Sequence, residues 1–398
     1  MAVTLITIST GVLLYAYILY PLFIGILSKL KPRQSRVDEA FQPQISIILS
    51  AYNEERHLGK CLDSLLTQNY PKNKIEILIG SDGSNDGTNT ILKDFATSYP
   101  SLKPNIFESR RGKMRVLNDL IANAKGEILL FVDADMVLSP DSLTKHVRHY
   151  IDEEVGGVAG IYRIVSDTQG GIYGSENDYH SYEMLLRKNE SLIHSTVGLS
   201  GGNYSIRKDL WKELPSDEIH DDLFSVFTLL ESGKRILFEP FAISTEHFVR
   251  SIREEFKRKA RFASRGFATL KFFPELLSPQ AGLVAVMIWS HKILRWIAPF
   301  LLMIIFATTV VGTVRGYASY FQILLIVEIF GIVTALIGWI LNSMNISVPL
   351  VRQIFWFVAM NLAFMFGTIR YVLGKDEQHW VIATRAASNR PILQEGHL

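Results

Sequence analysis

The chain contains 398 residues, enough for two or three domains, and carries a formal net charge of only +2 at pH 7. This balance argues against a protein that binds nucleic acid through its overall charge, so we expect no nucleic-acid partner. The single cysteine, Cys61, excludes an internal disulfide and a zinc site built from cysteines.

Residues 3–27 contain no charged side chain and are long enough to cross a hydrocarbon core of about 30 Å. A cleaved signal peptide is the alternative, but no basic residues precede this run, and it is too long for the apolar core of such a peptide. We therefore expect a transmembrane helix at residues 1–28. By the positive-inside rule, the basic residues that follow it place the next part of the chain in the cytoplasm; they are Lys29, Lys31, Arg33 and Arg36.

The next part, residues 29–278, is large enough for a globular domain with a sizeable core. In its first half, short apolar runs alternate with amphipathic runs. They predict strands at residues 45–49, 75–79, 105–108 and 127–132, and helices at residues 57–68, 88–99 and 113–124. This alternation predicts an α/β fold with a mostly parallel sheet, in which ligands bind beyond the carboxyl ends of the strands.

The strand at residues 127–132 runs directly into two carboxylates, Asp133 and Asp135, with one alanine between them. Burying one carboxylate beside apolar neighbours is unfavourable, and a second carboxylate nearby adds repulsion unless a cation compensates. A divalent ion held by oxygen ligands would relieve both effects. The alternative is a turn or helix cap without a ligand, because Ser139-Pro140-Asp141 offers a helix start at this end.

Two other predicted strands also end in polar residues. The first ends in a segment that includes Tyr52 and Glu54, and the second ends in a cluster of glycine, aspartate and asparagine at residues 81–88. Turn formation explains most of the second cluster. Asp82 is the exception, because it lies where the edge of a base or a ribose could be hydrogen-bonded.

Five motifs, in this order and spacing, resemble glycosyltransferase family 2 enzymes with the GT-A fold, over roughly residues 43–266. They are PQISIILSAYNEE, IGSDGSNDGT, GKMRVLNDLIANAKGEILLFVDAD, GLSGGNYSIRKDLW and HDDLFSVFTLLESGKRILFEPFAI, and a basic helix follows them. The resemblance implies a Rossmann-like GT-A catalytic domain, flanked here by transmembrane helices, that takes a nucleotide-sugar donor.

The resemblance also implies roles for the residues at the strand ends. Tyr52, Glu54 and Asp82 would hold the base and ribose of the nucleotide, and Lys113 would lie near its diphosphate. The two acids after the fourth predicted strand would bind a divalent metal, Mg²⁺ or Mn²⁺, that bridges the donor phosphates.

Transfer from a nucleotide sugar expels a diphosphate, so the site needs a Lewis acid for the leaving group and a general base for the incoming hydroxyl. The candidates for the base are Asp221 and Asp222, in the first turn of a predicted helix. The resemblance assigns the base to Asp222, the second acid of the pair. Helix capping is the alternative for Asp221.

The acceptor side is predicted in a loop and near the membrane. Gly201, Gly202 and Asn203 resemble the acceptor loop of the family, where glycines permit close backbone approach; a plain bend is the alternative. The basic helix near residues 251–271 is typical of a lipid-surface anchor, so membrane lipids are expected contacts.

Polymerising members of the family carry the signature Gln-x-x-Arg-Trp in this basic helix. In this chain Arg258 stands at the glutamine position, Arg261 matches the signature, and Phe262 stands at the tryptophan position. Arg258 and Arg261 remain candidates for binding the diphosphate, and Phe262 for contacting the acceptor. The two departures weaken the case for processive polymer synthesis.

The C-terminal third, residues 279–374, predicts about three more transmembrane helices, at residues 296–314, 317–341 and 353–369. Residues 281–294 are apolar but interrupted by His291 and Lys292, so we expect a helix that lies in the membrane interface. Three crossings would leave the C-terminus outside, whereas the basic residues of the tail, residues 375–398, argue against this. The side of the tail therefore stays open.

Together these features predict a membrane-bound inverting glycosyltransferase that moves a hexosyl or N-acetylhexosaminyl group to a lipid-linked or membrane-proximal glycan. The expected donor is a UDP-sugar, and the expected location is the plasma (inner) membrane with a cytoplasmic catalytic domain. One alternative is a processive polysaccharide synthase that extrudes its polymer through the C-terminal helices. Another is a non-catalytic subunit that binds a nucleotide sugar within a membrane assembly, although a scaffold would not need a base at Asp222.

Overall fold

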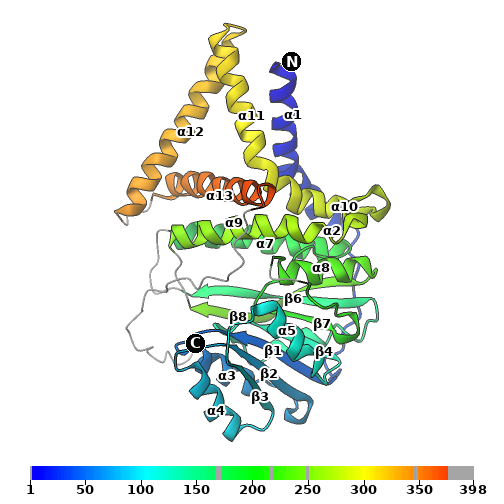
Figure 1. The fold of residues 1–398 in the computed structure, drawn as a ribbon. Helices are drawn as coiled ribbons and strands as arrows, with labels where there is room; N and C mark the ends of the chain where they lie inside the picture. Colours follow the sequence, from blue (N-terminus) through cyan, green and yellow to red (C-terminus); the bar gives the residue numbers. More distant parts are fainter. Residues whose placement is uncertain are drawn as a thin grey trace, which may run out of the picture.

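The computed structural model describes residues 2–165, 172–215, 218–247, 251–344, 346 and 348–374. The expected C-terminal tail, residues 375–398, lies outside these ranges. The described chain has two parts: a sheet with helices packed on it, and a group of long apolar helices that extends from one side of it (Figure 1).

The centre of the first part is an eight-stranded mixed sheet with the strand order β3-β2-β1-β4-β7-β6-β8-β5. The strands β1 to β4 are parallel, β7 is antiparallel to β4 and to β6, and β6 is parallel to β8. The predicted α/β fold with a mostly parallel sheet is thereby confirmed. The strands are β1 (Ile45–Ala51), β2 (Ile75–Asp82), β3 (Leu102–Phe107), β4 (Ile128–Val132), β5 (Met136–Leu138), β6 (Val155–Val165), β7 (Asn203–Arg207) and β8 (Arg235–His247).

Helices cover both faces of this sheet, which explains why its central strands are continuous apolar runs. Successive residues of a strand point to opposite faces, so Ile47 and Ile48 of β1 join two different hydrophobic cores. The core that contains Ile48 is closed by α5 (Lys113–Ala122) and α8 (Asp221–Glu231). The core that contains Ile47 is closed by α3 (Leu58–Leu66), α4 (Thr88–Ser98) and α6 (Ser142–Val147).

The remaining long helices lie between the sheet and the membrane side, or extend away from it. They are α1 (Ala2–Leu14), α2 (Tyr20–Leu30), α7 (Ile172–Ile193), α9 (Ile252–Leu270), α10 (Leu283–Ile288), α11 (Leu294–Val314), α12 (Ser319–Ser343) and α13 (Pro349–Val372). Within the described residues, four helical segments are long and apolar enough to cross a membrane: Ala2–Leu30, Leu283–Val314, Ser319–Ser343 and Pro349–Val372.

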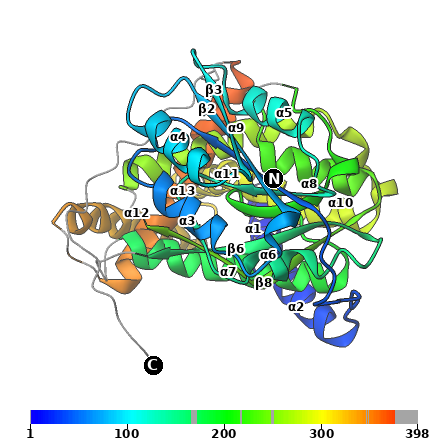
Figure 2. The same cartoon turned by 90° about the horizontal axis from the view of Figure 1, so that it is seen from below.

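These four segments are not all oriented alike. The helices α1, α11 and α12 extend away from the sheet, whereas α13 runs across their base beside α9 (Figure 1). Gly367 of α13 lies directly against the backbone of Ala260 in α9, with no space for a side chain between the two helices. Seen from below, the sheet with α3 and α4 lies in front, and α7, α9 and the apolar helices lie behind it (Figure 2).

The expected separate interfacial helix at residues 281–294 is instead continuous with the first C-terminal apolar helix. Helix α10 passes through a π-helical segment, Trp289–Ile293, directly into α11. The two charged residues that suggested an interruption, His291 and Lys292, are 2% and 4% exposed. Their partners lie on α7, so their charges are accommodated inside the protein without ending the helix.

Candidate functional site

A cavity of about 1150 Å³ lies at the carboxyl ends of β1, β2 and β4 and extends to α9, α13 and the base of α11. It brings together all but one of the residues that the sequence analysis assigned to a site. Those that line it are Tyr52, Glu54, Asp82, Lys113, Asp133, Asp135, Gly201, Gly202, Asp221, Asp222, Arg258, Arg261 and Phe262.

The loop after β1 has a left-handed residue, Asn53, with a φ of 55°. The side chain of Asn53 accepts a hydrogen bond from the backbone N–H of Asn85 at 2.9 Å. The backbone N–H of Asn53 donates a second hydrogen bond to Ser84 Oγ at 3.1 Å. These bonds join the loop after β1 to the loop after β2. They fix the position of Tyr52, whose ring lies 4.2 Å from the guanidinium carbon of Arg110.

Asp82, at the end of β2, is buried and binds the start of α5. Its carboxylate accepts hydrogen bonds from the backbone N–H groups of Arg111 at 2.6 Å and Gly112 at 3.0 Å. Gly112 has a φ of 92°, which a residue with a side chain adopts rarely. Asp82 therefore positions the first residue of α5, Lys113, in addition to lining the cavity.

Lys113 links the acids after β4 to the acids of α8. Its Nζ lies 3.0 Å from Asp133 Oδ1 and 3.0 Å from Asp221 Oδ2. Burial alone would lower the pKa of Lys113, but the two carboxylates raise it well above its usual value. Burial would raise the pKa of Asp221, but Lys113 holds it below its usual range.

Four carboxylates line the cavity wall on the sheet side, Asp133, Asp135, Asp221 and Asp222, and Lys113 contacts Asp133 and Asp221. Burial, together with the charges of Asp135 and Asp221, raises the pKa of Asp133 to about 6 in spite of Lys113. Carboxylates that lie close enough to raise one another's pKa fit a divalent ion such as Mg²⁺ or Mn²⁺. The acids after β4 thus remain a candidate metal site.

A second group of possible metal ligands consists of His220, Asp221 and Asp222, with ligand atoms within 4.8 Å of one another. The sequence analysis did not assign a metal to this group. One member, His220, would contribute a nitrogen ligand, whereas hard divalent ions prefer sites made wholly of oxygen ligands. We therefore retain Asp133 and Asp135 as the predicted metal ligands.

Asp222 lies beside the predicted acceptor loop. A side-chain carbon added at Gly201 would lie 3.5 Å from Asp222 Oδ2, in van der Waals contact, and both residues line the cavity. Asp222 forms an ion pair with His220, whereas Lys113 binds its neighbour Asp221. The two adjacent acids thus have different partners, and Asp222 is the one beside the acceptor loop.

Asn203 is the exception among the predicted site residues, because its side chain is fully buried away from the cavity. Its Nδ2 donates to the carbonyl oxygens of Ala242 at 2.8 Å and Ile161 at 3.2 Å. Its Oδ1 lies 2.8 Å from His146 Nε2. The pairing of β6 with β8 shifts register next to Ile161, and Asn203 binds the carbonyl groups at this irregularity. The expected acceptor contact of Asn203 is therefore replaced by a role inside the sheet.

The basic helix α9 begins with a capping box in which Ser251 and Glu254 bind each other's backbone N–H groups. Arg258 of this helix forms two hydrogen bonds of 2.7 Å with the buried Glu255. Phe262, at the position of the family's tryptophan, has its ring edge-to-face with His220 at 4.6 Å. Phe262 therefore stands next to the His220–Asp222 pair.

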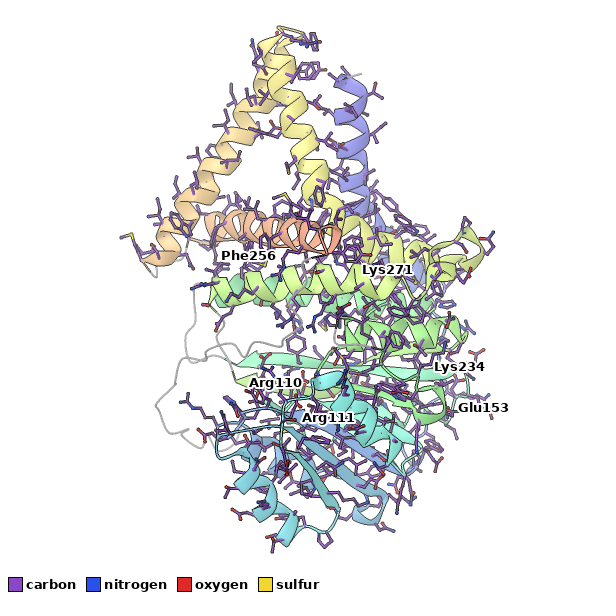
Figure 3. All side chains as sticks on the ribbon, viewed as in Figure 1. Arg110, Arg111, Glu153, Lys234, Phe256 and Lys271 are labelled. Carbon is purple, nitrogen blue, oxygen red and sulfur yellow. The ribbon has the colours of Figure 1, made fainter. Side chains whose placement is uncertain are left out.

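Sequence reasoning missed two sets of cavity residues. Arg110 precedes α5 with its neighbour Arg111 (Figure 3), and only the folded loop shows that its guanidinium covers Tyr52. The second set lies at the membrane end and comes from α7 and the base of α11: Glu183, Arg187, His291, Lys292 and Arg295. The sequence offered one indication of this second set, because His291 and Lys292 interrupt the apolar run at residues 281–294.

Residues 46–214 match the family model described as "Glycosyl transferase family 2". The chain is 28% identical over 261 residues to the poly-beta-1,6-N-acetyl-D-glucosamine synthase of Staphylococcus epidermidis, covering 64% of this chain and 62% of that protein. It is 24% identical over 198 residues to a Methanococcus voltae dolichyl N-acetyl-alpha-D-glucosaminyl phosphate 3-beta-D-2,3-diacetamido-2,3-dideoxy-beta-D-glucuronosyltransferase, covering 42% of this chain and 62% of that protein. It thus spans less than two thirds of the length of these relatives.

Among solved structures, the fold is similar to that of the mannosyltransferase PcManGT from Pyrobaculum calidifontis, which was determined in complex with GDP-Man and Mn²⁺. The TM-score is 0.73, the sequence identity is 21%, and the similarity covers 94% of this chain and 100% of that chain. Residues 46–214 are thus similar to glycosyltransferase family 2, and the sheet and helices of this chain have the GT-A fold.

Proposed function

We propose that this protein is a membrane-bound inverting glycosyltransferase that moves a sugar from a nucleotide sugar, expected to be a UDP-sugar, to a hydroxyl of a lipid-linked or membrane-proximal glycan. The observation that carries the proposal is the cavity itself. It joins the acids at the carboxyl ends of the strands to Phe364 and Phe366 of α13 and to the base of α11. A donor from the cytoplasm and an acceptor from the membrane would meet inside it.

The strand ends would bind the donor. Tyr52, Glu54 and Asp82 would contact the base and ribose, with Arg110 covering Tyr52. Lys113, Arg258 and Arg261 would contact the diphosphate, since all three line the same cavity. Asp133 and Asp135 would hold the divalent metal, which when bound supplies positive charge for the leaving diphosphate.

Asp222 would act as the general base. The acceptor hydroxyl attacks the anomeric carbon as the bond from that carbon to the phosphate oxygen breaks, and Asp222 takes the hydroxyl proton. A single displacement of this kind inverts the anomeric configuration and releases a nucleoside diphosphate. Because Lys113 neutralises Asp221 instead of Asp222, the second acid stays available beside Gly201.

The relatives support a lipid-borne acceptor and also leave a polymer product as the second candidate. The name of the methanococcal relative states that its acceptor is a sugar linked to dolichol through phosphate. The staphylococcal relative is named as a polysaccharide synthase, and it matches a larger share of this chain. Product length separates these two candidates.

A donor screen on purified full-length protein, following released nucleoside diphosphate, tests the proposal. We expect one class of nucleotide sugar to be consumed in the presence of Mg²⁺ or Mn²⁺ and a lipid-linked glycan. A protein that binds nucleotide sugars but turns none of them over would instead be the non-catalytic subunit of a larger assembly.

A further inference from the structure

The membrane end of the cavity contains one carboxylate surrounded by four basic side chains. Glu183 Oε1 lies 2.6 Å from His291 Nε2, 3.4 Å from Arg187 Nε and 3.7 Å from Lys292 Nζ. Glu183 Oε2 lies 3.1 Å from Arg295 Nη1. All five side chains line the cavity, and each is at most 12% exposed. Basic groups therefore exceed acids at this end.

Three of the four basic residues have a second polar partner. His291 Nδ1 lies 2.8 Å from Glu190 Oε1, Arg295 donates to the Tyr182 hydroxyl at 2.9 Å, and Arg187 donates to the Leu199 carbonyl at 3.0 Å. Lys292 differs from them. In the described part of the chain, its amine contacts Glu183 at 3.7 Å and the face of the Phe262 ring at 5.7 Å, and neither contact is a hydrogen bond.

Two of these cations lie close together on the cavity wall. A side-chain carbon added at Gly198 would lie 3.2 Å from both Lys292 Nζ and Arg187 Nε, so the two groups meet beside this glycine. Both side chains line the cavity, and their nitrogens are close enough for the oxygens of one phosphate group to contact both from the cavity side. Such an anion would give the Lys292 ammonium group a hydrogen-bond acceptor.

We propose that Lys292 and Arg187 bind a phosphate group that joins the acceptor's glycan to its lipid. This inference rests on the proposed function and adds that the acceptor carries a negatively charged phosphate. The acceptor loop connects the two sites, because Arg187 holds Leu199, and the loop continues to Gly201 beside Asp222. Phe262 lies between Lys292 and the His220–Asp222 pair. The phosphate would thus lie at the membrane end and the reacting hydroxyl near Asp222.

The position of the cluster separates this phosphate from the diphosphate of the donor. Lys113, near the donor diphosphate, is bound to Asp133 and Asp221 on the sheet side of the cavity. Lys292 lies at the base of α11, and Phe364 and Phe366 of α13 line the same end of the cavity. Phe256 of α9 packs near Phe366, with ring centroids 6.2 Å apart, and extends this apolar lining (Figure 3). An apolar chain attached to the phosphate would pass between these rings.

The test compares the wild-type protein with Lys292→Met and Lys292→Arg, and Lys271→Met serves as the matched control. Lys271 is an exposed lysine at the end of α9, over the Tyr371 ring and outside the cavity lining (Figure 3). Full-length proteins in phosphatidylcholine nanodiscs are titrated with a short-chain prenyl phosphate and with the corresponding prenyl alcohol. Turnover is then measured with a prenyl N-acetylglucosaminyl phosphate and with the neutral prenyl N-acetylglucosaminide.

We expect the wild type to bind the prenyl phosphate at least about 10-fold more tightly than the alcohol. Lys292→Met should weaken phosphate binding by about 10- to 100-fold, the loss expected for one charge-assisted hydrogen bond. Binding of the alcohol, KM for the neutral glycoside and thermal stability should stay unchanged. Lys292→Arg should keep most of the preference, and Lys271→Met all of it.

Equal binding of phosphate and alcohol by the wild type would overturn the inference, and so would an equal loss for both probes in Lys292→Met. Replacing phosphatidylcholine by phosphatidylglycerol shows whether a bilayer headgroup fills the site, because competition by that lipid would refute an acceptor phosphate. Binding with the expected preference but no transfer to either acceptor would contradict the proposed function and leave the anion site intact. The two failures are thus distinguishable.

Discussion

The pair Asp221 and Asp222 offers a stringent test, because the two acids are adjacent but have different partners. Both lie in the first turn of α8, and each can be replaced by the nearly isosteric asparagine with the same change of charge. Asp222→Asn removes the proposed base and leaves the bridge from Lys113 to Asp133 and Asp221 intact. We expect kcat to fall by roughly 10²- to 10⁴-fold, with donor affinity nearly unchanged.

Asp221→Asn should instead lower the stability of the protein. Lys113 keeps Asp133 at 3.0 Å but loses its charged partner on α8, and a hydrogen bond between charged groups contributes about 1.5–3 kcal/mol to stability. The side chains of Lys113 and Asp221 are 25% and 14% exposed, so screening by solvent reduces this value only in part. We expect a lower thermal unfolding midpoint and unweakened donor binding, because one negative charge has left the neighbourhood of the diphosphate.

The assay measures kcat from released nucleoside diphosphate, donor affinity by titration and the unfolding midpoint on the same preparations. We expect Asp222→Asn to lose turnover and Asp221→Asn to lose stability. Full turnover by Asp222→Asn would refute the assignment of Asp222 as the base. A loss of turnover in Asp221→Asn at unchanged stability would transfer the role of base to Asp221.

Four further predictions concern the metal, acid stability, topology and product length. Asp135→Ala should abolish turnover and metal-dependent donor binding, and undiminished activity of this variant in chelator would exclude the metal site. Burial lowers the pKa of His146 from 6.5 to about 4, so the unfolded chain takes up this proton first as the pH falls. The unfolding free energy should therefore drop by up to about 3 kcal/mol between pH 6.5 and 4, and thermal unfolding of His146→Gln should show a weaker pH dependence. With Cys61 replaced by serine, a cysteine at Ser35 should be protected from an impermeant thiol reagent in intact cells and one at Ser319 labelled, whereas labelling at Ser35 would contradict a cytoplasmic catalytic domain. Since Phe262 is a smaller sugar platform than tryptophan, excess donor with limiting acceptor should give one discrete product, and long polymer beside unused acceptor would refute this.

Local patterns were sufficient to predict residues that line the cavity at the strand ends. The apolar run of β4 and the acids Asp133 and Asp135 directly after it depend on residues close together in sequence, so a strand end with two carboxylates was recognisable. The helical pattern that begins at Lys113 is also local. The resemblance implied that Lys113 lies near the donor diphosphate. Only the structure shows its contacts with Asp133 and Asp221.

The membrane end could not be predicted in the same way, because its partners are distant in sequence. The charges of His291 and Lys292 looked like an interruption of an apolar helix, and only α7, about a hundred residues earlier, supplies the carboxylates that accommodate them. Asn203 shows the same limit. Its motif suggested an acceptor loop, but its partners are carbonyl groups on β6 and β8 that only the assembled sheet brings together.

The sharing of Glu183 among four basic groups has a consequence for how this region tolerates substitution. Replacing one of the four removes a single contact and leaves the carboxylate with three basic partners. Replacing Glu183 by glutamine has a different effect, because Arg187, Lys292 and Arg295 would then lose their shared carboxylate and repel one another in an environment of low dielectric. Among the basic positions to which no phosphate contact is assigned, His291 and Arg295, sequence variation should therefore be tolerated one residue at a time, whereas the glutamate can change only together with several of its partners.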